Sequence, residues 1–551
     1  MKRNAIKWLI KNSKSQRANL IWLILANTFF AIMTVSFAYV IKTVIDGAVN
    51  RDRTLFIVGA VAIISIVILQ FVFRLIINGL TEKIKYKLEI IFKTLLFKEI
   101  LKKKYQKIVA FHSGELQNRL TTDVSVVAEG MATILPTVVA SVTRLIAAVV
   151  VLCLIDWLFA CAFVVAGVLV FLVIGLLRKK LKALHKLSQE TDGKTRSYMQ
   201  ECLENLLAIK VFSVEEKTIG IADKLQKDNY KIKIKRRNYT ILGNSTYNFI
   251  FSAGYIFALI FGAIKIYGGV PDFGYGDLSA ILQLVNSVQV PFATLSGLMP
   301  KLYSTTASAE RIMEIEDLEE DKVIYTVDAT EVYNKMRSIE INNLSFSYDL
   351  REKVFENASL SIQKGQSFAI RCVSGIVKST IMKLMLGVYP VDSGEIYFNL
   401  ENGRMPLTEY TRSLFAYVPQ GNMLFSGTIK DNVTFINDSA TEEEIEKALK
   451  ISCADEFIES LPNKLNTVVG ENGLGLSEGQ IQRIAISRAV LSGAPIMLLD
   501  EATGSLDEKT EQKVIQNLLS IDNKTIILIS HRHTAINACE KVIQVDGKKF
   551  N

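Results

Sequence analysis

Two neighbouring stretches decide the fold of this chain, Leu476–Arg483 (LSEGQIQR) and Ile496–Glu501 (IMLLDE). The first is a Ser/Gly turn that opens an amphipathic helix, and the free N–H groups at a helix N-terminus bind phosphate. The second is an apolar run of the right length for a buried parallel strand, and it ends in the carboxylates of Asp500 and Glu501. Open α/β sheets bind ligands at the carboxyl ends of such strands. The pair therefore predicts an α/β domain with a phosphate site and two acids at its ligand edge.

Together the two stretches resemble the nucleotide-binding domain of ATP-binding cassette (ABC) proteins, whose signature is LSxGQ. The resemblance implies ATP and Mg²⁺ as ligands. It places Ser477, Gly479 and Gln480, at the positive end of a helix, against the γ-phosphate held by a second chain, so that each nucleotide lies between two subunits. It also implies that Asp500 holds Mg²⁺ through water, and that Glu501 acts as general base or orients the attacking water.

Four further positions match motifs of the same family. Tyr348, at the end of an alternating strand, matches the aromatic residue that stacks on adenine. Gln420 matches the Q-loop glutamine, which contacts Mg²⁺ and couples the site to the membrane domain. Asp507 matches the D-loop residue at the dimer contact. His531, which follows an apolar strand, matches the switch histidine that contacts the γ-phosphate. Residues 421–475 are expected to form a helical subdomain.

The phosphate loop departs from its expected pattern, G-x-x-x-x-G-K-[ST], in which a Gly-rich turn cradles phosphates. Cys372 and Val377 stand at the two fixed glycines. If Val377 must adopt positive φ, strain of about 1–3 kcal/mol would weaken nucleotide binding by about one to two decades. If the position requires only space, the loss is smaller. The residues expected at the nucleotide are Ser374, Gly375, Ile376, Val377, Lys378, Ser379 and Thr380, with Lys378 at the β/γ-phosphates and Ser379 at Mg²⁺.

Composition separates the chain into two halves. Its 551 residues predict more than one domain. Long apolar runs dominate up to about Tyr303, and short strands alternate with helices after Ser338, as in α/β folds. The net charge of +9 comes from Lys and Arg in loops that flank apolar runs, which argues against nucleic acid as a partner. The six cysteines show no spacing typical of a metal site or a disulfide framework.

Six apolar runs of near-spanning length predict an all-α membrane domain of six long helices. They lie at about 19–45, 55–80, 131–155, 157–177, 243–267 and 278–300. Residues 1–17 are basic and lack acids, which puts the N-terminus in the cytoplasm and makes the first run a retained span. The long Lys-rich links are then internal. Helical spacing over Thr81–Lys107 and Lys179–Arg236 predicts that the spans continue as helices into the cytoplasm.

This organisation resembles the exporter type of ABC transporter, as a half-transporter with one α/β P-loop ATPase cassette. The membrane domain is expected at 1–305, the linker at 306–337 and the cassette at 338–551. Gly114–Asp123 is similar to the turn before the first coupling helix of these exporters, and Glu204–Phe212 to their second internal loop. The acidic run Asp317–Asp321 in the linker is expected to be a solvated face.

Polar residues inside the spans are costly and mark either a transport pathway or hydrogen bonds between helices. Arg144 lies near the middle of the third span. Pairs and triads that share a helix face are Asn244 and Asn248 in the fifth span and Gln283, Asn286 and Ser287 in the sixth. For the Asn and Gln residues both interpretations stay open. For Arg144 the pathway is favoured, because an unpaired cation there needs water or an anion.

Two functions are consistent with these features. The first is an ATP-driven exporter that works as a dimer in the bilayer of a bacterial plasma membrane, with its N-terminus and cassette in the cytoplasm. A peptide or amphipathic substrate is favoured, lipids and drugs stay open, and leader cleavage by this chain is not expected. The second is a poorly hydrolysing regulatory or structural half of a heterodimer, which the altered phosphate loop supports and the intact Glu501, His531 and signature oppose. Homodimer and heterodimer both stay open.

Overall fold

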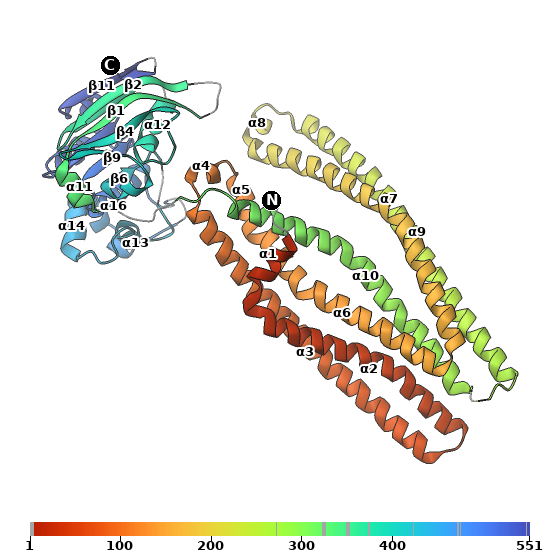
Figure 1. Cartoon of the computed structure of the whole chain (residues 1–551). Helices are drawn as coiled ribbons and strands as arrows, with labels where there is room; N and C mark the ends of the chain where they lie inside the picture. Colours follow the sequence, from red (N-terminus) through yellow and green to blue (C-terminus); the bar gives the residue numbers. More distant parts are fainter. Residues whose placement is uncertain are drawn as a thin grey trace. The chain divides into compact units, whose positions relative to one another are not determined.

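The computed structural model describes residues 5–271, 273–321, 327–348, 353–372, 375–421, 424–470, 473, 475–546 and 548–550. The chain forms two compact units (Figure 1). The membrane unit comprises Met1–Phe97 and Gly114–Glu316, and the cassette unit comprises Lys98–Ser113 and Asp317–Asn551. A short internal segment of the N-terminal half therefore belongs to the second unit.

The secondary-structure elements described in the membrane unit are all helical. The helices are α1 (Ala5–Asn12), α2 (Arg17–Val49), α3 (Arg53–Lys102), α5 (Ser113–Asn118), α6 (Val124–Ile155), α7 (Trp157–Glu204), α8 (Leu206–Val211), α9 (Glu215–Tyr267) and α10 (Tyr275–Glu316), with a π-helical turn at Arg119–Asp123. Among the described residues, five segments are long and apolar enough to cross a membrane: Lys14–Val49, Arg53–Lys102, Ser113–Ile155, Glu215–Tyr267 and Tyr275–Glu316. The predicted span at 157–177 lies in α7, where the side chains of residues 166–179 are not described.

Several helices are much longer than a membrane is thick. α3 has 50 residues and α9 has 53. At 1.5 Å per residue each is roughly 75–80 Å long, against about 30 Å of hydrocarbon. The predicted continuation of the spans as long helices is thereby confirmed, with two corrections. The helix predicted to reach Lys107 ends at Lys102, and the helix predicted over Lys179–Arg236 breaks between α7 and α9, where Ser213 has a φ of 50°.

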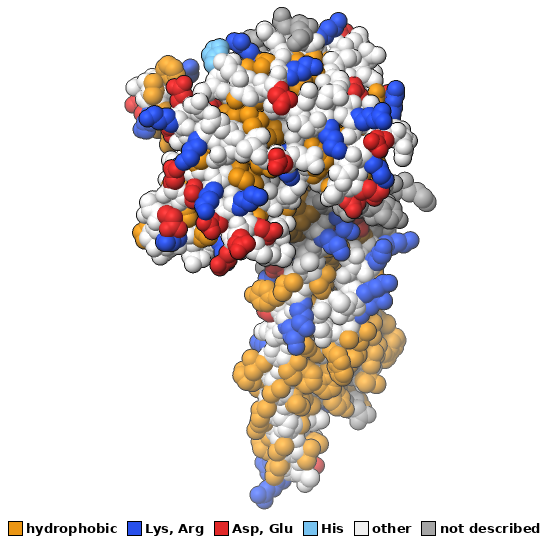
Figure 2. Space-filling model, turned by 90° about the vertical axis from the view of Figure 1, so that its left-hand side faces the viewer, with side chains coloured by type: hydrophobic (Ala, Val, Ile, Leu, Met, Phe, Trp, Pro, Cys, Tyr) orange, Lys and Arg blue, Asp and Glu red, His pale blue; other side chains and the backbone are white. Residues whose placement is uncertain are grey.

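The membrane unit buries one side of its helices and leaves apolar side chains exposed on the other. α6 packs against α2 and α10, and α7 pairs with α9. Val35, Ala148 and Leu284 belong to their buried core. By contrast, only 6% of the most apolar window of α3 is buried, and Figure 2 shows hydrophobic side chains gathered along the exposed helices. Large exposed apolar surfaces mark contact with lipid or another protein.

A buried ionic network joins the start of α6 to the end of α10. Asp123, which is 1% exposed, accepts hydrogen bonds from Ser308 Oγ at 2.8 Å and from Arg311 Nε at 2.8 Å. Arg119 donates to the backbone oxygen of Arg311 at 2.6 Å and pairs with Glu314 at 2.8 Å. Because each charge has a partner, the network holds the two helices together at this end.

The cassette unit contains two main sheets. Its strands are β1 (Met336–Ser347), β2 (Lys353–Gln363), β3 (Ser367–Cys372), β4 (Ser393–Leu400), β5 (Gly403–Pro406), β6 (Phe415–Val418), β7 (Gly427–Thr428), β8 (Val468–Val469), β9 (Ile496–Asp500), β10 (Thr525–Ile529), β11 (Lys541–Asp546) and β12 (Lys549–Phe550). One sheet is antiparallel with the order β2-β1-β4-β5, and the other has the order β12-β11-β3-β10-β9-β6. In the second sheet β11, β3, β10, β9 and β6 run parallel.

Helices cover the sheets and form a separate lobe. They are α4 (Tyr105–Val109), α11 (Ala329–Lys335), α12 (Gly375–Met385), α13 (Ile429–Val433), α14 (Glu442–Ile451), α15 (Asp455–Glu459), α16 (Glu478–Leu491), α17 (Glu508–Leu519) and α18 (His533–Asn537). α13, α14 and α15 lie within the predicted helical subdomain. They share a core with α16 that includes Ile429, Leu449 and Ile484.

The segment after α3 pairs with the acidic linker inside the cassette unit. Lys103 forms an antiparallel bridge with Glu320, and the Lys104 N–H donates to the Glu319 carbonyl at 3.0 Å. Their side chains also pair, with Lys103 Nζ 3.4 Å from Glu320 Oε1 and Lys104 Nζ 3.0 Å from Glu319 Oε2. The predicted solvated face is confirmed for these two glutamates, whose side chains are 54% (Glu320) and 64% (Glu319) exposed, and both also form ion pairs. Nearby lysines complement their charge.

Candidate functional site

The parallel sheet brings four groups of predicted site residues to one edge. Ile529 of β10 pairs with Asp500 of β9 and with Ile370 of β3, while Val418 of β6 pairs with Leu499 of β9. The carboxyl ends of all four strands therefore lie side by side. The phosphate loop follows β3, Glu501 follows β9, His531 follows β10 and Gln420 follows β6.

The Glu501 carboxylate contacts side chains from the three neighbouring strand ends of this edge. Its Oε1 lies 2.8 Å from Lys378 Nζ and 3.4 Å from His531 Nδ1, and its Oε2 accepts a hydrogen bond from Gln420 Nε2 at 2.6 Å. Burial opposes ionisation of this carboxyl, but Lys378 and then His531 outweigh it and lower the pKa of Glu501. The structure thus joins four residues that the sequence predicts separately, and keeps the carboxylate charged.

The backbone at Glu501 is held in an unusual conformation. Its φ of 50° lies in the left-handed region, which costs a residue other than glycine about 1–3 kcal/mol. The Glu501 N–H donates to the Ile529 carbonyl at 3.0 Å, and the Glu501 carbonyl accepts from the Gly504 N–H at 3.1 Å. These bonds fix the turn between β9 and the D-loop. They also aim the carboxylate at the neighbouring strand ends.

Asp500 offers a ligand atom that suits Mg²⁺. It is 1% exposed, and burial raises its pKa while the hydroxyls of Ser379 and Tyr417 act in the opposite direction. Tyr417 donates to Oδ2 at 3.3 Å, and Oδ1 is buried without a hydrogen-bond partner in the described part of the chain. A hard cation prefers such oxygen ligands. Asp500, Ser379 and Gln420 fit Mg²⁺, which would neutralise phosphate charge when bound.

The phosphate-loop residues are only partly described. Ser374 lies outside the described residues, and the side chains of Gly375, Ile376 and Val377 are not described. α12 begins at Gly375, so the backbone of Val377 is helical and its φ is negative. The alternative in which Val377 suffers positive φ is therefore not supported. The alternative that remains is competition for space with the ligand.

Replacing Val377 with glycine should tighten ATP binding by less than about tenfold, because only side-chain volume is removed. Val377→Ala is the matched control, since it trims volume without giving the freedom of positive φ and keeps better helix propensity. Titration of the full chain with a fluorescent ATP analogue and Mg²⁺ measures both variants. A glycine variant that binds ten- to a hundredfold more tightly than the alanine variant would restore the strain explanation.

Tyr348 and Thr380 lie next to one another. Tyr348 is 45% exposed, and its hydroxyl lies 3.0 Å from the buried Thr380 Oγ1 of α12. The structure therefore ties the predicted adenine platform to the helix that follows the phosphate loop. Stacking on adenine stays a prediction for this ring.

The signature helix begins as its sequence suggests. Ser477 is the N-cap of α16, its Oγ accepts from the Gln480 N–H at 3.3 Å, and Gln480 Oε1 accepts from the Ser477 N–H at 2.9 Å. A Cβ on Gly479 would lie 2.9 Å from the Ser505 carbonyl oxygen, so only glycine lets the D-loop approach. Gln482, which the sequence reading missed, accepts from the Ser505 N–H at 3.1 Å and fixes the same loop.

Asp507 and Glu511 hold the D-loop from the side of α17. Asp507 is the N-cap of α17 and accepts from the Thr510 N–H at 3.0 Å. Glu511 is fully buried and accepts from Thr503 at 2.8 Å, Arg532 at 3.1 Å and Thr534 at 3.0 Å. A signal for Glu511 exists in the sequence, because it occupies the buried stripe of α17 that also contains Val514, Ile515 and Leu518.

Replacing Glu511 with glutamine should lower the free energy of unfolding of the cassette by about 1–3 kcal/mol, because an amide N–H would face the three donors. Thermal unfolding of the full chain in lipid nanodiscs measures this. Glu508→Gln, at an exposed position of the same helix, is the matched control and should leave the midpoint unchanged. Equal midpoints for both variants would contradict the assigned network.

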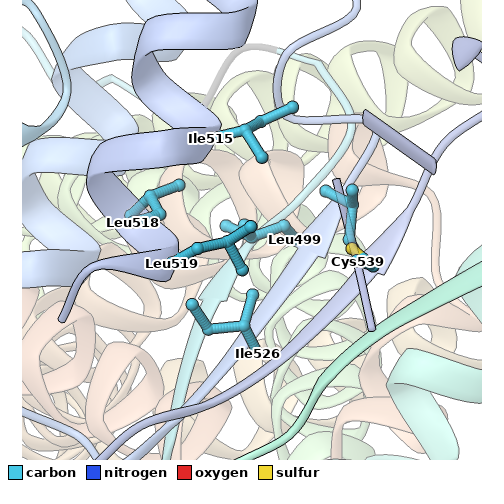
Figure 3. Close-up of a pocket in the computed structure, with 7 residues that line it drawn as sticks. Leu499, Ile515, Leu518, Leu519, Ile526 and Cys539 are labelled. Carbon is cyan, nitrogen blue, oxygen red and sulfur yellow. The ribbon is translucent and has the colours of Figure 1, made fainter. Parts of the chain in front are cut away.

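A small cavity behind β9 is a packing defect rather than a ligand site. It holds about 10 Å³, and its lining side chains point inward in Figure 3. The lining residues are Leu499, Ile515, Leu518, Leu519, Ile526, Leu528 and Cys539. A buried water needs at least this volume and several polar partners. Burial raises the pKa of Cys539 to about 11, so the thiol stays protonated.

Known proteins share both units of this chain. The family profile described as ABC transporter transmembrane region matches residues 18–292, and the profile described as ABC transporter matches residues 355–504. ABC transporter B family member 1 of Dictyostelium discoideum is 31% identical over 459 residues, which are 82% of this chain and 50% of that protein. The chain therefore spans half the length of that relative.

Two further matches cover nearly the whole chain. The ATP-dependent lipid A-core flippase of Francisella tularensis subsp. holarctica is 27% identical over 541 residues, 95% of this chain and 87% of the flippase. The solved structure of a bacterial Atm1-family ABC exporter with ATP bound has a TM-score of 0.80 at 22% identity and covers 97% of this chain and 94% of that chain, which shows the fold. The chain belongs to the ABC transporters. With one membrane region and one cassette, it is a half-transporter of the exporter type.

Proposed function

We propose that this chain is one half of an ATP-driven exporter that hydrolyses ATP between two cassettes and moves a peptide or amphipathic substrate out of the cytoplasm. The observation that carries the proposal is the convergence of Lys378, Gln420 and His531 on Glu501, all within 3.4 Å. A family relationship alone would not require these side chains to meet. Their meeting supports a working hydrolytic edge despite the altered phosphate loop.

The chemistry follows from the groups at this edge. ATP would draw Lys378 onto its phosphates and leave the Glu501 carboxylate to face a water molecule. The water oxygen forms a bond to the γ-phosphorus as the bond from that phosphorus to the β–γ bridging oxygen breaks. Glu501 accepts or orients the water proton, and His531 contacts the transferred phosphoryl group. ADP and phosphate are the products.

A second half-transporter is the partner that the surface of this chain suits. No described contact joins Ser477, Gly479 or Gln480 to Lys378 or Glu501 of the same chain, so the signature helix is available to another copy's nucleotide. Apolar side chains are also exposed on both units. In and beside α8 these are Leu207 at 79%, Val211 at 68% and Phe212 at 73%, and on the cassette they are Phe425 at 55%, Phe435 at 55% and Ile436 at 59%. Such residues favour burial against a partner.

The mass and activity of the chain purified alone test this assembly. In lipid nanodiscs with ATP and Mg²⁺ we expect a two-chain particle that releases phosphate. If phosphate release appears only after co-expression with a different half-transporter, the dimer is heterologous. Absence of both assembly and hydrolysis under either condition would reject the proposed function.

Arg144 supports an amphipathic substrate with an anionic group. Its Nε and Nη2 donate to Ser287 Oγ at 3.2 and 2.9 Å, and Ser287 is buried. No acidic side chain among the described residues pairs with this guanidinium. A guanidinium has five N–H donors and favours bidentate contact with carboxylate or phosphate. Asn244, Asn248 and Asn286 are exposed in the single chain and suit a polar path.

The alternative is a poorly hydrolysing half of a heterodimer with a regulatory or structural role. One observation favours it, namely Cys372 and Val377 at the fixed glycines of the phosphate loop. In that case this chain's signature helix would still serve the nucleotide on the partner. The co-expression experiment above separates the two functions.

We place the protein in a bacterial plasma membrane, with the N-terminus and the cassette in the cytoplasm. Lys2, Arg3, Lys7, Lys11 and Lys14 support this orientation, because basic residues flank spans on the cytoplasmic side. Cysteine labelling of intact cells tests it. A cysteine placed at Asp52, between α2 and α3, should react with a membrane-impermeant reagent, and one placed at Lys107 should not.

A further inference from the structure

Four aromatic rings form a continuous cluster in the cassette unit. Tyr389, which follows α12, is at its centre. The centroid of the Tyr389 ring lies 5.2 Å from the ring centroid of Tyr348, 6.0 Å from that of Phe346 and 6.1 Å from that of Tyr105. The corresponding interplanar angles are 89°, 70° and 82°. Phe346 also contacts Tyr348 edge to face at 5.0 Å and 82°. Such perpendicular pairs contribute attraction beyond the area that they bury.

Tyr389 makes these contacts with its aromatic ring. No described hydrogen bond involves its hydroxyl. The ring is half-buried, and burial, with the neighbouring Tyr348 and Tyr105, raises the pKa of the Tyr389 hydroxyl. The hydroxyl therefore stays neutral. A phenylalanine at this position should keep the same three ring contacts, which supplies a conservative test variant.

Tyr105 connects this cluster to the first internal loop, which is the stretch between α3 and α5 at residues 103–112. It is the first residue of α4, directly after Lys103 and Lys104, which pair with Glu320 and Glu319. Tyr105 is therefore held on the cassette both by the ion pairs of the two preceding lysines and by its ring contact with Tyr389. A ring held at such a point supports its neighbour against rotation.

We propose that Tyr389 is a positioning residue for the base of the nucleotide, which holds the ring of Tyr348 for adenine and is itself supported by Tyr105. The inference rests on the proposed function, since it presumes that ATP binds at this site. It adds that base recognition depends on a residue of the first internal loop. By linkage, whatever displaces α4 must then change the contribution of adenine to binding, and adenine must change the position of α4.

The test separates the base from the phosphates. Affinities of the full chain in nanodiscs are measured for ATP and for inorganic tripolyphosphate, both with Mg²⁺. Tyr389→Ala and Tyr105→Ala should each weaken ATP binding by about three- to tenfold and leave tripolyphosphate binding unchanged. Tyr389→Phe should match the wild type. Tyr230→Ala is the matched control, because Tyr230 is 64% exposed on α9 and makes no ring contact in the described structure.

Each outcome decides the proposal. If Tyr389→Ala lowers the affinities for ATP and tripolyphosphate equally, the role of Tyr389 is merely structural. If it changes neither affinity, Tyr389 has no role in nucleotide binding. If Tyr389→Ala does not fold, Tyr389→Leu is measured in its place. A Tyr105→Ala variant with wild-type affinities would overturn the link to the internal loop. Failure of the wild-type chain to bind either ligand would instead reject the proposed function.

Discussion

Replacing Glu501 with glutamine should lower the ATPase rate of the reconstituted protein by about two to four orders of magnitude. The Glu501 carboxylate can accept a proton from water, and an amide cannot. Burial works against its charge, but Lys378 and His531 hold the pKa of Glu501 below its usual value. The carboxylate is therefore ionised throughout the neutral range, so its own titration should not limit the wild-type rate between pH 6 and 9. Phosphate release at saturating ATP measures the rate.

The same substitution should tighten ATP binding by about three- to tenfold. In the wild-type chain Lys378 Nζ lies 2.8 Å from Glu501 Oε1, and ATP must open this pair. Glutamine removes the charge that competes with the phosphates. Glu446→Gln removes an exposed acid that pairs with Lys450 at 2.6 Å and should change neither property. Hydrolysis by the Glu501 variant within threefold of the wild-type rate would show that another group activates the water.

Replacing Arg144 with alanine should raise the concentration of an anionic amphiphile needed for half-maximal ATPase stimulation by about ten- to a hundredfold. The guanidinium lies within α6, where the described structure gives it a hydroxyl partner and no carboxylate. A charge inside a span is costly unless water or an anion solvates it. An anionic headgroup or a peptide carboxylate would supply charge-assisted hydrogen bonds there. Arg144→Lys should keep the charge and lose less apparent affinity for the anionic amphiphile than Arg144→Ala.

Matched ligands and a matched arginine make this second experiment specific. Lysophosphatidylglycerol is compared with lysophosphatidylcholine, and an acidic peptide with its amidated form. Arg74→Ala is the control, because Arg74 lies nearer the end of its span, over the Phe30 ring at 5.8 Å. We expect Arg144→Ala to affect only the anionic member of each pair and to leave ATP affinity unchanged. An equal loss for neutral and anionic ligands would assign Arg144 to helix packing.

Sequence reasoning reached those parts of the fold that local patterns encode. The apolar run before Asp500 is the buried strand β9, and Ser477 caps α16. Contacts between distant segments were beyond it. No pattern in the sequence around Tyr389 predicts its contact with Tyr105. The pairing of Lys103 with Glu320 of the linker is likewise visible only in the folded chain. The choice at Val377 depended on where α12 begins, which is a property of the backbone rather than of residue type.

The cassette is a discontinuous domain, and this limits how it can be studied in isolation. The polypeptide passes between the units at Phe97–Lys98, Ser113–Gly114 and Glu316–Asp317. A fragment excised at Asp317 would lack the strand partner of Glu320 and the ring that covers one side of Tyr389. It would expose an unpaired backbone edge, which favours self-association. Soluble cassette fragments of this protein should therefore include residues 98–113, joined to the cassette by a flexible linker.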